Sequence, residues 1–342
     1  MADQKLLIIQ PDCRSYRIDF FKKLSNEIGS FSLFHNGPLV FENSNLVNEK
    51  NIKIINFKSF KIVPNLKEII KDFDVIILGH DFHWINLFFL PLLTNKTIIF
   101  WSHGPGRSKL LKPLRFLTAH NANSIITYSE IGKKKYIDIG IKKQKIFVAP
   151  NTLHVGNSED TSSELSKNSF IFLGRLQRRK KLDIFFEAYK DAVLDKKNIK
   201  IIIIGDGEEE KQFLINKAKQ LNILHLIEFV KGTSDNKILI SYFEKSYAYI
   251  SPGAVGLGLL HSFAFGTPVI SMPDKMHGPE IENLKDGYNG YFATDKKDLV
   301  EKLKLAIINH SEIGHNAYQT YSLNCSLINM VDGFKAAIKY SI

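Results

Sequence analysis

The sequence predicts an α/β protein made of two domains, each with a Rossmann-like parallel sheet. First, short continuous apolar runs, typical of strands that are covered on both faces, alternate with stretches long enough for helices. Second, this alternation stops at a polar, serine-rich segment and then restarts. Third, the length of 342 residues exceeds that of one average domain. Strands that alternate with helices in this way favour a parallel sheet.

The first half of the chain opens with a βα unit. The apolar run Leu6–Ile9 is followed by a polar loop at residues 10–16 and by an amphipathic stretch that ends at Ile28. We therefore expect residues 1–152 to form an N-terminal domain and residues 153–168 to be a linker. Further strands of this domain are predicted from the apolar runs at residues 75–78, 97–101, 124–127 and 146–149.

The second half repeats the pattern and predicts a second Rossmann-like domain at residues 169–322. A final helix is expected within residues 323–342, because its apolar side chains recur on one helical face. Open α/β sheets bind ligands at the carboxyl ends of their strands, so two facing domains predict a site in the cleft between them. The predicted strands of the second domain lie at residues 170–173, 201–204, 227–230, 248–251 and 269–270.

The composition is that of an ordinary soluble protein, but the charge is not balanced. The formal net charge is +11, which indicates an anionic partner such as nucleic acid, an acidic membrane surface or a phosphorylated substrate. The only cysteines, Cys13 and Cys325, exclude a disulfide framework and fit a reducing cytoplasm. No signal peptide or membrane-spanning segment is expected, since the longest apolar stretch, at residues 84–93, is too short and contains Pro91.

The most informative stretch is residues 251–280. A predicted strand leads into a loop with glycines at Gly253, Gly256 and Gly258, and a short apolar helix follows up to Gly266. Such a loop leaves backbone N–H groups free at the start of a helix, where an anion is favoured. A phosphate-bearing ligand is therefore predicted, although glycines that only make a tight turn explain the same pattern.

Four segments of the second half, in their order and spacing, resemble the nucleotide-sugar-binding domain of GT-B glycosyltransferases, most closely the retaining family-4 type. They read GRLQRRKKLDIFFEAY, IIIIGDG, SPGAVGLGLLHSFAFGTPVI, and HGPE with DGYNG downstream. The resemblance covers nearly the whole chain. It implies the GT-B fold, in which two Rossmann-like domains face a cleft and the final helix returns to pack on the first domain.

The resemblance also implies the residues that hold a nucleotide-sugar donor. Arg175 and Lys180 match the positions that hold the donor diphosphate, whose negative charge grows as it leaves. A solvated basic turn is the alternative, because Arg178, Arg179 and Lys181 crowd the same segment. The other residues expected to contact the donor are Gly174, Lys231, Gly253, Ala254, Val255, Gly256, Leu257, Gly258, His261 and Glu280.

The central motif departs from the family. Family-4 enzymes usually carry two glutamates separated by seven residues across this loop and helix. Alignment on the segment LLHSFAFG puts Gly253 and His261 at those places, so both carboxylates are missing. We expect His261 to hydrogen-bond a ribose hydroxyl or face a phosphate, with a buried structural histidine as the alternative. Glu280 is a candidate substitute acid, unless it is a surface carboxylate.

The first domain supplies fewer signals. His103 follows a predicted strand, and the same region of the family contributes a histidine to the donor sugar, so we group it with Arg175 and Lys180 as catalytic. The loop after the first strand carries the expected acceptor-side residues Asp12, Tyr16 and Arg17, and His80, Asp81 and His83 are in a similar position. No Asp-x-Asp motif suited to a metal-held diphosphate appears, so we expect no metal and no cofactor besides the donor substrate.

The basic charge has a second interpretation in the first domain. Lys109, Lys112 and Arg115 interleave with apolar residues up to Leu117, a pattern that suits an anionic membrane leaflet as well as an ordinary amphipathic helix. We therefore expect a cytoplasmic protein, with peripheral binding to the inner face of the cell membrane as a hypothesis. Nucleic acid is not expected as a partner, because no recognised motif or stacking surface accompanies the charge.

The sequence thus predicts a glycosyltransferase that moves a sugar from a nucleotide-sugar donor to a glycan acceptor. The resemblance implies retention of anomeric configuration, and the favoured acceptor is a lipid-linked intermediate of bacterial-type surface polysaccharide. The alternatives are a non-catalytic GT-B protein that binds donors or scaffolds a complex, for which the lost glutamates argue, an inverting transferase, and a nucleotide-sugar epimerase.

Overall fold

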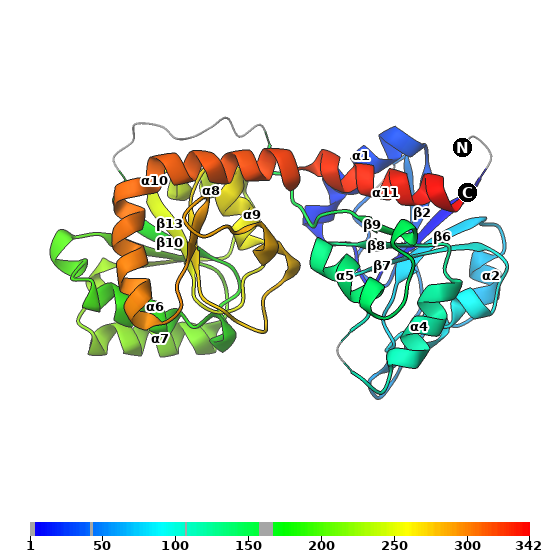
Figure 1. The fold of residues 1–342 in the computed structure, drawn as a ribbon, viewed down its shortest axis with the longest axis horizontal. Coiled ribbons are helices and arrows are strands. Elements are labelled where there is room, and N and C mark those ends of the chain that lie inside the picture. The colour runs from blue at the N-terminus through cyan, green and yellow to red at the C-terminus, as the bar shows by residue number, and fades with distance from the viewer. Residues whose placement is uncertain (1–3, 42–43, 107, 157–166) are drawn as a thin grey trace. The chain divides into compact units, whose positions relative to one another are not determined.

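The computed structural model describes residues 4–41, 44–106, 108–156 and 167–342 (Figure 1). The chain divides into two compact units. Unit 1 consists of Met1–His154 with Leu327–Ile342, and unit 2 is Val155–Ser326. Each unit contains one large parallel sheet covered by helices on both faces, which confirms the predicted α/β fold class. Most of the predicted linker lies outside the described residues.

The sheet of unit 1 has seven parallel strands in the order β3-β2-β1-β6-β7-β8-β9. Its central strands are almost entirely buried because helices cover both faces, as their continuous apolar runs predict. The strands are β1 (Leu6–Ile9), β2 (Phe31–His35), β3 (Val47–Asn51), β6 (Val75–Gly79), β7 (Thr97–Ser102), β8 (Ser124–Thr127) and β9 (Ile146–Val148).

Successive side chains of each strand enter two separate cores. Leu6 and Ile8 of β1 face the core under α1 (Ile18–Ile28) and α11 (Leu327–Ser341), whereas Leu7 and Ile9 face the opposite core. Figure 1 shows α1 and α11 side by side on one face of the sheet. The opposite face carries α2 (Leu66–Ile70), α3 (Ile85–Phe88), α4 (Lys112–Asn121) and α5 (Glu130–Asp138).

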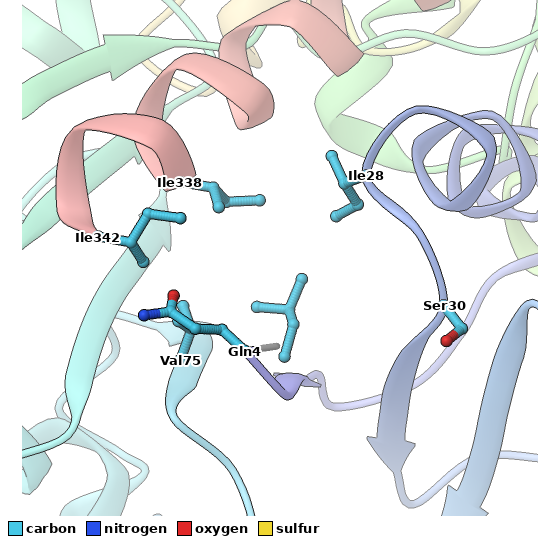
Figure 2. A pocket seen from close by; sticks show the side chains of 7 residues that line it. Gln4, Ile28, Ser30, Val75, Ile338 and Ile342 are labelled. Carbon is cyan, nitrogen blue, oxygen red and sulfur yellow. The ribbon is translucent and has the colours of Figure 1, made fainter. Parts of the chain in front are cut away.

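The final helix packs on the first unit, as the resemblance implies. Helix α10 ends at Asn324, and α11 then buries Met330, Phe334 and Ile338 against α1 and the sheet of unit 1. Figure 2 shows Ile338 and Ile342 pointing toward Ile28 at a small pocket. This pocket lies at the starts of β1 and β6, at the edge of the sheet opposite to the carboxyl ends, so it is not part of the predicted site.

Between β3 and α2 the chain forms an antiparallel hairpin that the sequence pattern did not predict. Its strands are β4 (Ile55–Phe57) and β5 (Phe60–Ile62), which pair through Ile55 with Ile62 and Phe57 with Phe60. Every residue of β4 is exposed. The hairpin is held to the loop after β6, because the N–H of Lys61 donates to the carbonyl of His83 over 2.6 Å.

Within the described residues, no helix of either unit is both long and apolar enough to cross a bilayer.

Unit 2 has a six-stranded parallel sheet in the order β12-β11-β10-β13-β14-β15. The strands are β10 (Ser169–Leu173), β11 (Lys200–Ile204), β12 (Ile227–Val230), β13 (Ser246–Ser251), β14 (Val269–Ser271) and β15 (Gly290–Phe292). The helices are α6 (Leu182–Asp191), α7 (Glu208–Gln220), α8 (Asn236–Phe243), α9 (Gly258–Ala264) and α10 (Lys296–Asn324).

Candidate active site

The predicted donor residues of unit 2 gather at one edge of its sheet. Because all six strands are parallel, the loops that follow them leave from the same, carboxyl edge. Gly174 and Arg175 follow β10, Lys231 follows β12, and the glycine-rich loop follows β13, the strand beside β10. The sheet order therefore brings together loops that are up to about eighty residues apart in the chain.

The glycine-rich loop is joined to the basic turn η4 (Arg178–Lys180). The N–H groups of Gly253 and Ala254 donate to the carbonyls of Lys180 and Arg179 over 3.0 and 2.9 Å. The two backbones approach so closely that a Cβ atom on Gly253 would lie 2.0 Å from the carbonyl oxygen of Arg179. Position 253 therefore has no room for a side chain.

Lys180 is the buried cation of this junction. Its side chain is 8% exposed and its Nζ donates a hydrogen bond to the carbonyl of Ala254. Burial lowers the pKa of Lys180 to about 8, and the charge of Arg179 adds to this shift, whereas the carboxylate of Glu280 opposes it. Arg175 is exposed and makes no ion pair among the described residues. Lys180 and Arg175 thus offer one buried and one exposed positive charge.

The second half of the glycine-rich loop is the part left open to a ligand. Val255 is buried and its N–H donates to Nδ1 of His277 over 3.1 Å, while its carbonyl accepts from Gly278. By contrast, the half-buried residues Gly256, Leu257 and Gly258 have N–H groups without a hydrogen-bond partner in the described part of the chain. A Cβ atom on Gly256 would meet nothing within 4 Å, so open space lies beside this residue.

His261 lies on α9, in the turn after these free N–H groups, and it is half-buried. Burial lowers its pKa to about 4, so the imidazole is neutral at physiological pH. Its Nδ1 lies 3.4 Å from the carbonyl of Leu257, which only accepts hydrogen bonds. Nδ1 therefore carries the proton, and Nε2 is left as an acceptor for a hydroxyl group.

Glu280 is not a surface carboxylate, because it is only 5% exposed in the turn η7 (Pro279–Asn283). A Cβ atom on Gly278 would lie 2.2 Å from Oε2 of Glu280, so the carboxylate folds back over the segment that binds Val255. Its negative charge also raises the pKa of Lys180 against the effect of burial. Glu280 and Lys180 are therefore electrostatically coupled across the glycine-rich loop.

The remaining strand-end loop, Gly205-Asp206-Gly207, has a structural explanation. Both glycines have positive φ, and a Cβ atom on Gly205 would lie 1.9 Å from the carbonyl oxygen of Gly174. Oδ1 of Asp206 accepts a hydrogen bond of 3.1 Å from the N–H of Gly232 and so joins the loop to the segment after β12. The side chain of Lys231 next to it is exposed.

In unit 1, His103 follows β7 at the carboxyl edge and stacks on Tyr128, with 4.3 Å between the ring centroids. The residue is exposed, but the protein around the ring partly desolvates the imidazole and lowers its pKa, and the nearby charge of Arg17 lowers the pKa further. The imidazole is therefore biased toward its neutral form. Two of the predicted acceptor-side residues also lie at this edge: Asp12 forms an ion pair of 2.7 Å with Arg14, and Tyr16 is 37% exposed.

Arg17, the third predicted acceptor-side residue, points into unit 1. It is 7% exposed, and its guanidinium donates to Oδ1 of Asn151 over 2.5 Å and to Sδ of Met330 over 3.0 Å. It also lies over the rings of Trp101 and Tyr128, at 5.2 and 5.5 Å. The structure thus gives Arg17 a packing role between the first loop and α11.

His80, near this edge, is held by hydrogen bonds within the protein. His80 is buried, hydrogen-bonds to Tyr136 and Thr118, and has its pKa lowered to about 3 by burial. One Asp-x-Asp sequence does occur, at Asp72 and Asp74, but it precedes β6 and so lies at the amino edge. No cluster of three or more histidine, cysteine or carboxylate side chains is present among the described residues.

Comparison with known proteins identifies the enzyme class. Residues 157–320 match the model of the family described as glycosyl transferases group 1. Two uncharacterised glycosyltransferases of Methanocaldococcus jannaschii are similar to the chain. MJ1059 is 27% identical over 63% of this chain and 61% of its own length, and MJ1069 is 22% identical over 90% of this chain and 87% of its own.

Among solved structures, HepE of Anabaena in complex with UDP and glucose has a TM-score of 0.72 and 13% sequence identity, and the match covers 98% of this chain and 99% of HepE. The similarity extends over both units and confirms the GT-B fold. The prediction of a glycosyltransferase is likewise confirmed at the level of the enzyme class.

Proposed function

We propose that this glycosyltransferase, which matches the group 1 family model and has the GT-B fold, moves a sugar from a nucleotide-sugar donor to a hydroxyl group of a glycan acceptor. The observation that carries the proposal is the junction at the carboxyl edge of unit 2. There, Nζ of Lys180 donates to the carbonyl of Ala254 in the glycine-rich loop, and the exposed Arg175 follows the neighbouring strand β10. The N–H groups of residues 256–258 in the same loop have no partner among the described residues. These are the groups that a diphosphate needs.

In this proposal the diphosphate is held by the second half of the glycine-rich loop. The N–H groups of Gly253, Ala254 and Val255 are used within the protein, so these residues shape the loop, and the direct donors are those of Gly256, Leu257 and Gly258. Lys180 stabilises the leaving diphosphate as its charge develops, and Arg175 closes on it from the exposed side. The complexes of HepE with UDP and with UDP-glucose support a uridine nucleotide as the first donor to test.

His261 takes the place of one of the missing glutamates. A neutral imidazole with its proton on Nδ1 offers Nε2 as an acceptor, which is the hydrogen-bonding role that a carboxylate has toward a ribose hydroxyl. Glu280 supplies a buried carboxylate whose charge raises the pKa of Lys180 against the effect of burial. His103 of unit 1 keeps the role that the resemblance implies, a contact to the donor sugar.

The chemistry that we propose is transfer with retention of configuration. The acceptor hydroxyl attacks the anomeric carbon on the face from which the diphosphate departs, and the departing phosphate oxygen accepts the hydroxyl proton. The new glycosidic bond forms as the bond to the diphosphate breaks, so the sum of charges is conserved. Lys180 and Arg175 lower the barrier by stabilising the charge that develops on the leaving group. The protein groups described here do this without a metal ion.

For the acceptor we propose a lipid-linked glycan, as in the synthesis of surface polysaccharide, reached by a cytoplasmic enzyme at the inner face of the cell membrane. The support is the basic, apolar-backed segment before and within α4. There, Leu110 is 91% exposed and Leu117 is 44% exposed, and the lysines beside them, Lys109 and Lys112, are exposed as well.

The test is a turnover assay with a panel of nucleotide sugars and a lipid extract. We expect release of nucleotide diphosphate with one donor and an α-anomeric product from an α-linked donor, read by NMR. His261→Ala is expected to lower donor affinity about tenfold, whereas His261→Gln, which keeps an acceptor, should retain part of it. Unchanged donor binding and turnover in His261→Ala would refute the ribose assignment.

A non-catalytic, donor-binding protein is the second candidate function, because neither glutamate of the usual motif is present. Such a protein would bind the donor diphosphate at the same site as the proposed glycosyltransferase, but it would not transfer the sugar. Donor binding without release of nucleotide from any donor would favour this candidate. The absence of both binding and turnover would refute the proposed function altogether.

A further inference from the structure

The hairpin of β4 and β5 exposes an apolar face on unit 1. Its pairing register places Ile55, Phe57, Phe60 and Ile62 on the same face, because directly opposite residues of antiparallel strands share a side. Phe60 packs edge-on against Phe82, at 5.8 Å between ring centroids. The other three side chains remain exposed, by 46% for Ile55, 64% for Phe57 and 36% for Ile62. A two-stranded hairpin with an uncovered apolar face is marginally stable by itself.

The apolar surface continues from the hairpin into a groove. Ile62 is shared between the two, and the groove then runs between α2 and the turn η2 (Leu90–Leu92), with a volume of about 880 Å³. At its far end Leu93 is 66% exposed, and Leu92 beside it is 39% exposed. The apolar residues that line the groove are Ile62, Val63, Leu66, Ile70, Leu90 and Leu93.

Lysines surround this apolar surface. Residues 53–71 contain five lysines and one carboxylate, and that carboxylate, Glu68, pairs with Lys71 over 3.1 Å. Lys58 lies at the tip of the hairpin with φ of 54°, a conformation that costs a lysine more than it costs glycine or asparagine. The charge at the tip is thus present despite a conformational cost. The remaining lysines are Lys53, Lys67 and Lys61. Lys61 pairs with Asn56 and so lies on the opposite face of the hairpin, with its Nζ over the ring of Trp84.

We propose that this hairpin and groove form the surface by which unit 1 binds an anionic lipid bilayer, with Phe57 inserted among the headgroups and the lysines on lipid phosphates. Apolar side chains set among lysines are what an anionic interface binds. A second copy of the chain fits less well, because self-association would bring the same lysines against one another.

The surface adjoins the edge of the sheet at which the acceptor residues lie. Lys61 forms a parallel bridge with Trp84 and donates to the carbonyl of His83, in the loop after the carboxyl end of β6. A bilayer that holds the hairpin therefore lies next to the loop after β6. This consequence rests on the proposed function, in which the acceptor is lipid-linked, whereas bilayer binding itself does not.

The test is sedimentation of the full chain with vesicles of phosphatidylcholine, with and without phosphatidylglycerol. The wild-type protein is expected to bind the anionic vesicles at low salt and to dissociate at high salt. Phe57→Asp should weaken binding about tenfold or more, because it replaces an inserted ring with a negative charge. Lys58→Gln should weaken binding about fivefold, and only to the anionic vesicles.

Two variants serve as controls. Ile308→Asp changes a side chain of α10 in unit 2 that is 73% exposed, and it should bind as the wild type does. Leu110→Asp changes the other apolar and basic segment, before α4, which supports the lipid-linked acceptor. It should weaken bilayer binding, but less than Phe57→Asp does. The proposal is overturned if the wild type does not bind, or if Phe57→Asp binds normally, or if Ile308→Asp or Leu110→Asp loses as much as Phe57→Asp. UDP titration of the same variants separates this failure from failure of the proposed function, because all of them should keep their affinity for UDP.

Discussion

Gly253 lies where the backbone leaves no room for a side chain. The loop reaches the η4 turn so closely that no Cβ atom fits, and the backbone of residues 253 and 254 bonds to that turn. The sequence alone indicated a glycine-rich loop but not this close approach, since only coordinates reveal which N–H groups are already used. For the same reason, it could not distinguish buried Glu280 from a surface carboxylate.

Replacing Gly253 with alanine tests this close approach. The added Cβ atom has to push two backbone segments apart, so we expect a loss of about 2 kcal/mol or more in the free energy of unfolding, together with weaker donor binding. The measurement is urea unfolding followed by far-UV circular dichroism. Gly256→Ala is the matched control, because open space lies beside Gly256, and its stability should remain that of the wild type. Equal stability of both variants would contradict the account.

Lys180 predicts how donor affinity depends on pH. Its pKa is lowered to about 8 by burial, so in the ligand-free protein it is charged below pH 8 and increasingly neutral above it. Because the diphosphate binds the charged form, affinity for UDP should fall as the pH rises through about 8. Calorimetric titration across this range measures the effect, and Lys180→Met should abolish most of it and weaken binding about tenfold or more.

Lys167 provides the control for that experiment. It is another lysine of unit 2 whose burial lowers its pKa to about 8, but its Nζ donates to the carbonyl of Glu244, at the amino end of the sheet. Lys167→Met should therefore leave the pH dependence of UDP binding unchanged. If it removes the dependence and Lys180→Met does not, the assignment of Lys180 is wrong.

Among the elements, the long apolar strands were predictable and the irregular ones were not. The runs that became β1, β6, β10 and β11 are buried on both faces and read as continuous apolar sequence. Strand β2 was missed because the polar residues Ser32 and His35, although buried, interrupt its apolar run, and β3 because it is a mostly polar edge strand. The hairpin was missed since Lys58 and Ser59 at its turn lack the usual glycine or asparagine signal.

The contact between Arg17 and helix α11 predicts how much Arg17 contributes to the stability of unit 1. Arg17 joins the loop after β1 to Met330 of α11 and to Asn151, with no carboxylate partner among the described residues. Arg17→Met should keep the packing but leave the polar group of Asn151 without this donor, at a cost of about 1–3 kcal/mol. Tryptophan fluorescence measures it, because both tryptophans, Trp84 and Trp101, belong to unit 1.

The control for this variant is Arg14→Met in the same loop. Arg14 is exposed and forms only a surface ion pair with Asp12, so its loss should change the stability of unit 1 by no more than about 0.5 kcal/mol. If Arg17→Met proves as stable as Arg14→Met, then Arg17 is not a packing residue, and its original interpretation as an acceptor-side residue regains support.

At the scale of the whole molecule, fold and enzyme class followed from the order of strands, loops and motifs, and both are confirmed by comparison. What the sequence could not supply was the chemistry of single groups, because that depends on burial and on hydrogen bonds made across the sheet. The charge of +11 likewise predicted an anionic partner but not its place. In the structure, exposed lysines lie near exposed apolar side chains at the β4–β5 hairpin and in the segment before α4.

The central claim is that unit 2 holds the diphosphate of a nucleotide-sugar donor at Lys180, Arg175 and residues 256–258. Calorimetric titration of the full chain with nucleoside diphosphates and the matching monophosphates, starting with UDP and UMP, tests it most directly. We predict that one diphosphate binds about tenfold or more tightly than its monophosphate, and that Lys180→Met removes most of this difference. Equal affinity for diphosphate and monophosphate, or no binding of any nucleotide, would contradict the account.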